Sequence, residues 1–222
     1  MRCGFHAAIS KRLPFDLAVP VSSHISGFTK RDLEKRLRQR SAALYSGGGA
    51  LDRPATNARG CAKIVPVDHL HYMQRAFEDA RQAYAAGNRP VAALIVRDDV
   101  IISAGRNTVY AEHDPSAHAE VAAIRVACRK LDTLDLSGAT LYSTLEPCPM
   151  CLWMILETKI ARVVLGARHA ALKRADIGDY SVETFLALTR RPLEVVTGVL
   201  EQPCVDLRLQ WMQEQSKRTA SR

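Results

Sequence analysis

The chain reads Glu-Pro-Cys-Pro-Met-Cys at residues 146–151, and upstream of this it reads Ser-Ala-His-Ala-Glu at residues 116–120. Each stretch follows a turn and opens an apolar run, which predicts that each begins a helix. Cys148 and Cys151 are spaced so that their side chains project from one face of a first helical turn. A helix N-terminus also stabilises a thiolate. We therefore expect two helix N-termini to bring His118 and the two cysteines to one point.

These side chains form a ligand set with catalytic rather than structural character. One imidazole and two thiolates suit zinc, and three protein ligands leave the fourth tetrahedral position open for water. Zinc lowers the pKa of bound water from about 15.7 towards about 7. Glu120 is not needed as a ligand, and its place two residues after His118 favours a role in proton transfer. Each of these residues alone would more often be an ordinary core residue, but together they match H-x-E with P-C-x-x-C, the signature of zinc nucleobase deaminases.

The composition is that of an ordinary globular protein. Of the 222 residues, 47% are hydrophobic and 24% are charged, and no apolar run approaches the roughly 20 residues of a membrane-spanning helix. The six cysteines show no disulfide-scaffold spacing, and a thiolate zinc site fits a reducing compartment, so we expect a cytoplasmic protein. Cys128 and Cys204 are expected to be buried and inert.

The positive charge of the chain lies in front of the residues that carry the chemistry. Residues 1–65 hold 12 Lys and Arg against 4 Asp and Glu, which accounts for the whole formal net charge of +8. Residues 66–222 hold 19 of each sign and are neutral overall. The global charge is therefore weak support for a nucleic-acid substrate.

Three segments follow from these patterns: a basic, disordered extension over residues 1–65, a zinc-dependent catalytic domain over 66–216, and a basic tail over 217–222. Within the extension, Thr29 to Tyr45 has capping-box spacing and could form a basic helix. The sequence leaves the role of the extension open. It is either a tail, including one produced by an upstream start codon, or an arm that targets the protein or contacts RNA.

The catalytic domain shows alternating strand and helix patterns. A helix is predicted from the N-cap Asp68 to Gly87-Asn88, followed by a hairpin of strands over 91–96 and 100–104. Further strands are predicted over 140–143, 160–165 and 193–199, and further helices from 118, from 148, and over 181–188 and 205–215. Strands that alternate with helices after an initial hairpin predict an α/β fold, a three-layer α/β/α sandwich with a mixed five-stranded sheet.

With these motifs identified, the chain resembles the cytidine/deoxycytidylate deaminase superfamily, and within it the bacterial tRNA adenosine deaminase branch and its guanine deaminase neighbours. The resemblance covers Met73 to Met212 and depends on several short motifs. These are Arg89-Pro90-Val91-Ala92-Ala93, Gly105-Arg106-Asn107, His113 to Glu120, Thr140-Leu141-Tyr142, Leu145 to Cys151, and Arg162 to Arg168.

The resemblance implies a role for each motif residue. His118, Cys148 and Cys151 would bind zinc, and Glu120 would shuttle protons. Asn107, at the end of the second hairpin strand, would hydrogen-bond the base, and the backbone N–H of Ala119 would contact its ring. Members of the family are typically dimers, so the implied partners are a nucleobase-containing substrate and a second copy of the chain, with no membrane.

The motifs in which this chain departs from the tRNA branch bear on the choice of substrate. That branch usually has a Lys-Thr-Gly-Ala-type loop where this chain has His169 to Arg174, whereas guanine deaminases share the Glu146 to Leu152 form. The best interpretation is conversion of adenosine to inosine in tRNA, and the alternative is a deaminase of free nucleobases or nucleosides. A hypothesis of another class is a non-catalytic, zinc-binding RNA partner subunit, although such subunits often lack the shuttle glutamate that Glu120 provides.

The other candidate residues have plainer explanations. His113 and Asp114 are expected to cap the loop before Pro115, and Trp153 to make core or dimer contacts rather than to stack on a base. Lys173 and Arg174 could contact a phosphate, but a pair of basic residues is usually a solvated turn.

Overall fold

The computed structural model describes Lys35 and residues 68–220, so the expected basic extension, apart from Lys35, and the helix expected within it lie outside the described residues. The elements follow in the order α2 (His69–Ala85), β1 (Ala92–Arg97), β2 (Val100–Arg106), α3 (Val109–Glu112), α4 (Ala119–Leu131), β3 (Thr140–Leu145), α5 (Pro149–Glu157), β4 (Arg162–Ala167), η1 (Ala175–Ile177), α6 (Val182–Thr189), β5 (Glu194–Val196) and α7 (Glu201–Ala220). This is the predicted alternation of strands and helices after a hairpin.

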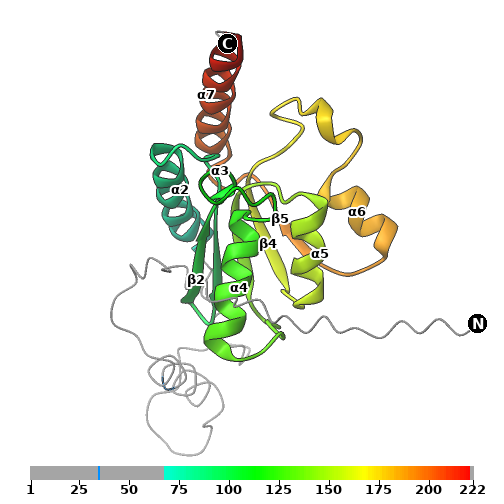
Figure 1. Cartoon of the computed structure of the whole chain (residues 1–222). Helices are drawn as coiled ribbons and strands as arrows, with labels where there is room; N and C mark the ends of the chain where they lie inside the picture. Colours follow the sequence, from blue (N-terminus) through cyan, green and yellow to red (C-terminus); the bar gives the residue numbers. More distant parts are fainter. Residues whose placement is uncertain (1–34, 36–67, 221–222) are drawn as a thin grey trace, which may run out of the picture.

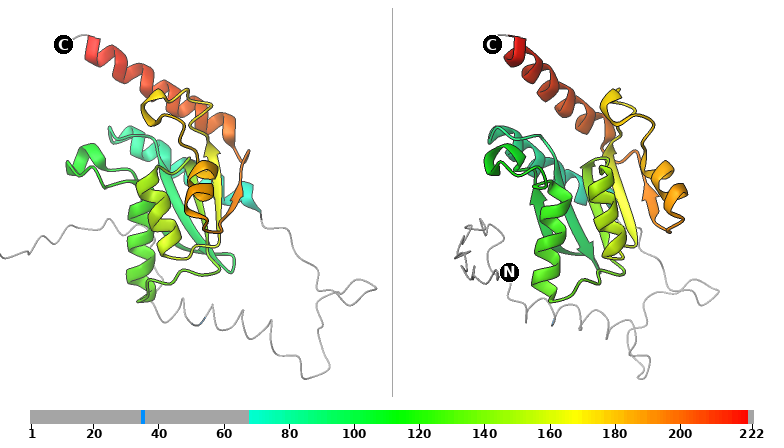
Figure 2. Two further views of the ribbon diagram at one scale, coloured as in Figure 1. Left: turned by 90° about the vertical axis from the view of Figure 1, so that its right-hand side faces the viewer. Right: turned by 45° about the vertical axis from the view of Figure 1, so that its right-hand side comes forward.

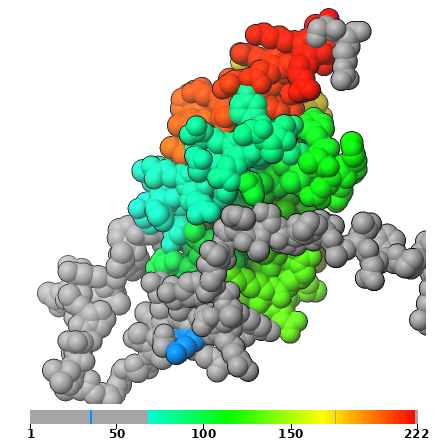
Figure 3. Space-filling model, turned by 60° about the vertical axis from the view of Figure 1, so that its left-hand side comes forward, coloured from blue at the N-terminus to red at the C-terminus, as the bar shows by residue number. Residues whose placement is uncertain are grey.

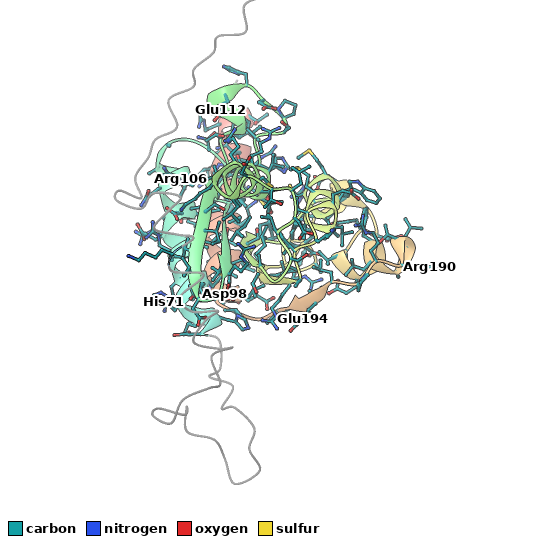
Figure 4. All side chains as sticks on the ribbon, turned by 90° about the horizontal axis from the view of Figure 1, so that it is seen from below. His71, Asp98, Arg106, Glu112, Arg190 and Glu194 are labelled. Carbon is teal, nitrogen blue, oxygen red and sulfur yellow. The ribbon has the colours of Figure 1, made fainter. Side chains whose placement is uncertain are left out.

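The five strands form one mixed sheet in the order β2-β1-β3-β4-β5. The pairs β1–β2 and β1–β3 are antiparallel, and the pairs β3–β4 and β4–β5 are parallel. Arg106 of the edge strand β2 and Glu194 of the edge strand β5 accordingly lie on opposite sides of the domain in Figure 4. The predicted mixed five-stranded sheet is confirmed.

Alternating side chains of the strands fill two cores, one on each face of the sheet. Figures 1 and 2 show the helices that cover these faces. Leu94, Tyr142 and Val164 pack with the apolar face of α2. Their sequence neighbours face the other way and pack with α4 and α5, and this larger core includes Ile95, Leu141, Val163, Ile124 and Ile155. The domain therefore has the predicted three layers.

Two glycines allow helices to approach the sheet closely. A Cβ at Gly105 in β2 would lie 2.2 Å from the carbonyl oxygen of Ala119, in the first turn of α4. A Cβ at Gly166 in β4 would lie 2.7 Å from Sγ of Cys204 in α7. Because real Cβ atoms do not come this close to other atoms, both positions require glycine, and Gly105 fixes where the helix after His118 begins.

The C-terminal half differs from the sequence-based boundaries in two places. Strand β5 covers three residues rather than the expected 193–199, because it is an edge strand that pairs only with Arg162–Val164 of β4. Helix α7 covers Glu201–Ala220 rather than 205–215, and Lys217 and Arg218 in its last turn complement the helix dipole. On the face shown in Figure 3, α7 lies against α2, to which the hydroxyl of Tyr84 ties it by a hydrogen bond to Glu214.

None of the helices among the described residues combines the length and the apolar character that crossing a membrane requires.

Candidate active site

The three predicted metal ligands meet at one point. Nδ1 of His118 lies 3.5 Å from Sγ of Cys148 and 3.4 Å from Sγ of Cys151, and the two sulfur atoms are 3.6 Å apart. Ligands at about 2.0 Å (nitrogen) and about 2.3 Å (sulfur) from one tetrahedral zinc ion would stand about 3.5 Å (nitrogen to sulfur) and about 3.8 Å (sulfur to sulfur) from one another. The side chains therefore fit a zinc ion with almost no rearrangement, and they form a His/Cys/Cys metal site within the described part of the chain.

Two helix N-termini position these ligands, as the sequence predicted. His118 is the N-cap of α4 and Cys148 is the N-cap of α5, both with extended backbone, and neither cap residue uses its side chain to satisfy its helix. Pro149 occupies the first turn of α5, where its missing N–H costs nothing. Both helices begin at the same end of the sheet (Figure 1), so their positive dipole ends point towards the thiolates.

The ionisation of the site suits a cation. The pKa of Cys148 is lowered to about 4, first because of its hydrogen bond with Cys151 and then because of its hydrogen bond with His118. The hydrogen bond with Cys148 raises the pKa of Cys151 in turn. The pKa of His118 is raised by the same Cys148 sulfur. Without a metal ion the three groups thus share protons, which metal binding would displace.

Glu120 lies in the first turn of α4 with only 3% of its surface exposed. Its Oε1 is 3.0 Å from the hydroxyl of Ser143 in β3. Burial raises the pKa of Glu120, and its charge acts on both His118 and Cys151. A raised pKa makes this carboxylate a stronger base, which suits a group that takes a proton and returns it during a reaction.

The two predicted substrate contacts lie where β2 and α4 meet the site. Asn107 directly follows β2 and is 3% exposed, and its Oδ1 also accepts a long hydrogen bond of 3.4 Å from the N–H of Val109 at the start of α3. The backbone N–H of Thr108 donates to the carbonyl of Ala117, which ties this loop to the residue before His118. Ala119 is fully buried at the first position of α4. Their contacts with a base remain predictions.

Glu146 is a buried supporting residue that the motif analysis did not single out. Its side chain is 1% exposed and accepts hydrogen bonds from the guanidinium of Arg168 and from the backbone N–H groups of His169 and Val182, at 2.8 to 3.3 Å. Although burial opposes its charge, these donors lower the pKa of Glu146. Glu146 thereby holds the segment after β4 against the loop that leads to Cys148. The sequence signal that could have identified Glu146 was its position two residues before the ligand Cys148.

The secondary candidates behave largely as expected. Asp114 accepts hydrogen bonds from the N–H and the hydroxyl of Ser116, and His113 ends α3 in a left-handed conformation, so the predicted loop-capping role is confirmed. Trp153 is 47% exposed and packs edge-on against Phe185 of α6. Arg174 is not a freely solvated side chain, because it pairs with Asp176.

Comparison with known proteins places these observations in a family. The model of the cytidine and deoxycytidylate deaminase zinc-binding region matches residues 66–167. A tRNA-specific adenosine deaminase of Aquifex aeolicus is 35% identical over 141 residues, which cover 64% of this chain and 82% of that protein. A guanine deaminase of Bacillus subtilis is 40% identical over 114 residues, which cover 51% of this chain and 73% of that protein.

Solved structures share the fold. One, from a study of A-to-I editing by tRNA:A34 deaminases at the wobble position, aligns with a TM-score of 0.55 at 33% identity and covers 62% of this chain and 98% of that chain. A guanine deaminase from Nitrosomonas europaea aligns with a TM-score of 0.59 at 25% identity and covers 75% of this chain and 98% of that chain. By its sequence, its sheet and its His/Cys/Cys site, the chain belongs to the cytidine and deoxycytidylate deaminase family.

Proposed function

We propose that this protein is a hydrolytic deaminase that converts adenosine to inosine in tRNA and releases ammonia. The observation that carries the chemistry is the buried carboxyl of Glu120 next to the converging atoms of His118, Cys148 and Cys151. A purely structural zinc site would use four protein ligands, and the described residues place three together.

Each residue of the site has a separate role in the reaction. His118, Cys148 and Cys151 would hold zinc, which when bound supplies activated water at neutral pH. Glu120 accepts a proton from the attacking water, delivers it to a ring nitrogen of the base, and then assists departure of the amino group as ammonia. Its burial excludes bulk water from these transfers. Asn107 and the N–H of Ala119 hold the ring in place.

Two relatives support different substrates. A tRNA substrate is favoured because this chain matches a larger share of the tRNA-specific relative. This chain matches 82% of the tRNA-specific adenosine deaminase of Aquifex aeolicus but 73% of the guanine deaminase of Bacillus subtilis. The higher identity to the guanine deaminase, 40%, keeps free guanine as the second candidate.

The proposal includes a homodimer in the cytoplasm. Three large apolar side chains of α5 and α6 are exposed, Met150, Trp153 and Leu188, at 39%, 47% and 81%. Helices α5 and α6 pack together through Trp153 and Phe185, and exposed apolar side chains on neighbouring helices favour a protein interface. Light scattering on the purified protein tests this, and a monomer at micromolar concentration would contradict it.

The substrate is tested by ammonia release from the zinc-loaded protein. An anticodon stem-loop bearing adenosine would be offered in parallel with guanine, adenine, cytosine and their nucleosides. We expect release from the stem-loop and formation of inosine within it. Release from guanine alone would establish the second candidate. No release from any of these compounds, with zinc bound, would support a non-catalytic partner subunit.

A further inference from the structure

Arg208 of α7 is a buried cation, and two of its guanidinium nitrogens have no hydrogen-bond partner among the described residues. Its side chain belongs to a residue that is 6% exposed, and its Nε and Nη1 atoms are buried without an acceptor. The guanidinium lies over the ring of Trp211, 4.3 Å from the centroid, which satisfies none of its N–H groups. Because an unpaired buried charge is strongly destabilising, its presence calls for an anion that the described residues do not provide.

The charges of two further guanidinium groups act on Arg208. The pKa of Arg208 is lowered to about 10, first by burial and then by the charges of Arg174 and Arg89. Asp176 is the acidic group that acts on it, but both carboxylate oxygens of Asp176 are hydrogen-bonded to Arg174. Among the described residues, this cluster therefore combines three cations with one carboxylate that is already paired.

The cluster lies at the rim of the metal site. The charge of Arg89 acts on His118, and the charges of Arg174 and Cys148 act on each other, so both arginines lie within electrostatic range of the metal ligands. Arg89 follows α2, Arg174 lies between β4 and η1, and Arg208 comes from α7. These segments gather at the end of the sheet where α4 and α5 begin (Figures 1 and 2).

Two further donors near this cluster lack partners. Nε of Arg89 and Nε1 of Trp211 are also buried without an acceptor among the described residues. Tyr110 stacks on Trp211 with centroids 6.2 Å apart and lies under the guanidinium of Arg89, and it stays 45% exposed. Guanidinium groups beside an accessible aromatic face are the combination that binds the backbone and bases of single-stranded nucleic acid.

We propose that Arg208, together with Arg89 and Arg174, binds one backbone phosphate of the RNA substrate, next to the nucleotide whose base enters the zinc site. The planar fork of a guanidinium matches two phosphate oxygens, which a buried and preformed arginine can meet at little further entropic cost. The identification of RNA as the source of the phosphate rests on the proposed function; the anion site itself does not.

The anion site is tested on the zinc-loaded full chain with inorganic phosphate as the probe. Three proteins are compared by thermal unfolding: wild type, Arg208→Met and the control Arg97→Gln, whose arginine ends β1 about 17 Å from the site end of that strand. Phosphate is expected to raise the Tm of wild type and Arg97→Gln but not that of Arg208→Met. Without phosphate, Arg208→Met is expected to melt at or above the wild-type Tm, because methionine removes an unpaired buried charge.

The RNA source is tested by binding of the adenosine stem-loop in a Glu120→Gln background, in which turnover is expected to be slowed at least about a hundredfold. Adding Arg208→Met is expected to weaken binding about tenfold and to reduce the slope of log affinity against log salt by about 0.7, the contribution of one single-strand phosphate. Arg97→Gln in the same background should leave both quantities unchanged.

Different failures have different meanings. Equal phosphate-induced Tm shifts in wild type and Arg208→Met, or none in either, would overturn the anion site. A large loss of Tm in Arg208→Met without phosphate would show a structural role and would also overturn it. If no RNA is deaminated while the Arg208-dependent phosphate shift persists, the proposed function and the RNA source are overturned, but the anion site stands.

Discussion

The metal site lies at the same end of the sheet as the cluster of Arg89, Arg174 and Arg208, which we call the rim. The two regions differ in whether their buried polar groups have hydrogen-bond partners. Around the metal site, buried groups have partners within the domain, as Glu146 has in Arg168, His169 and Val182. On the rim, the buried donors of Arg208, Arg89 and Trp211 have no acceptor among the described residues. The difference indicates that the fold itself holds the side chains around the metal site in place, whereas it leaves donors on the rim open to a ligand.

The largest expected effect comes from the metal ligands. Cys148→Ser replaces a thiolate whose pKa is about 4 with a hydroxyl that is not ionised at neutral pH, so zinc and all deaminase activity should be lost. The matched control is Cys128→Ser, which changes a thiol of α4 that is not part of the ligand set and should keep both. Metal analysis and ammonia release measure the outcome. Full zinc content in Cys148→Ser would contradict the ligand assignment.

A smaller effect is expected at Glu146, the buried carboxylate that supports the metal site. Glu146→Gln places an amide against the donors of Arg168 and His169 and leaves Arg168 without its buried countercharge, which should cost about 3 kcal/mol of unfolding free energy. The control is Glu157→Gln, which removes an exposed ion pair with Arg191 and should cost less than about 1 kcal/mol. Denaturant unfolding measures both. Equal stabilities of the two variants would show that Glu146 does not hold the segment after β4.

The same carboxylate gives a pH signature. The pKa of Glu146 is lowered in the folded protein, so its contribution to stability is complete above the unfolded pKa of about 4.3 and is lost as pH falls through the folded value. The stability difference between wild type and Glu146→Gln should therefore be largest near neutral pH and should shrink in acid.

The sequence predicted the metal side of the molecule better than the rim, for a physical reason. His118, Cys148 and Cys151 are brought together by local signals, namely two helix starts after turns and a spacing of one helical turn. The sheet followed from period-two and helical patterns that each element carries by itself. Such features are encoded within short stretches of chain.

The rim depends on contacts between distant segments, and no short pattern encodes them. Arg89, Arg174 and Arg208 come from three separate segments, and Arg174 appeared in the sequence only as half of a basic pair expected to be solvated. The pairing of Arg174 with Asp176 and the burial of Arg208 appear only once α7 packs against β4 through Gly166. Neutrality of residues 66–222 concealed this local excess of positive charge, because net charge does not report where charges gather.

The central claim, that Glu120 moves the protons at a zinc site, is tested most directly by Glu120→Gln. The amide keeps the size of the side chain and an oxygen for Ser143, but it cannot accept and return a proton. The account predicts unchanged zinc content and Tm with deaminase activity reduced about 10²- to 10⁴-fold, the range for loss of a general acid–base group. Activity within a few-fold of wild type, measured on the same zinc-loaded protein and substrate, would contradict the account.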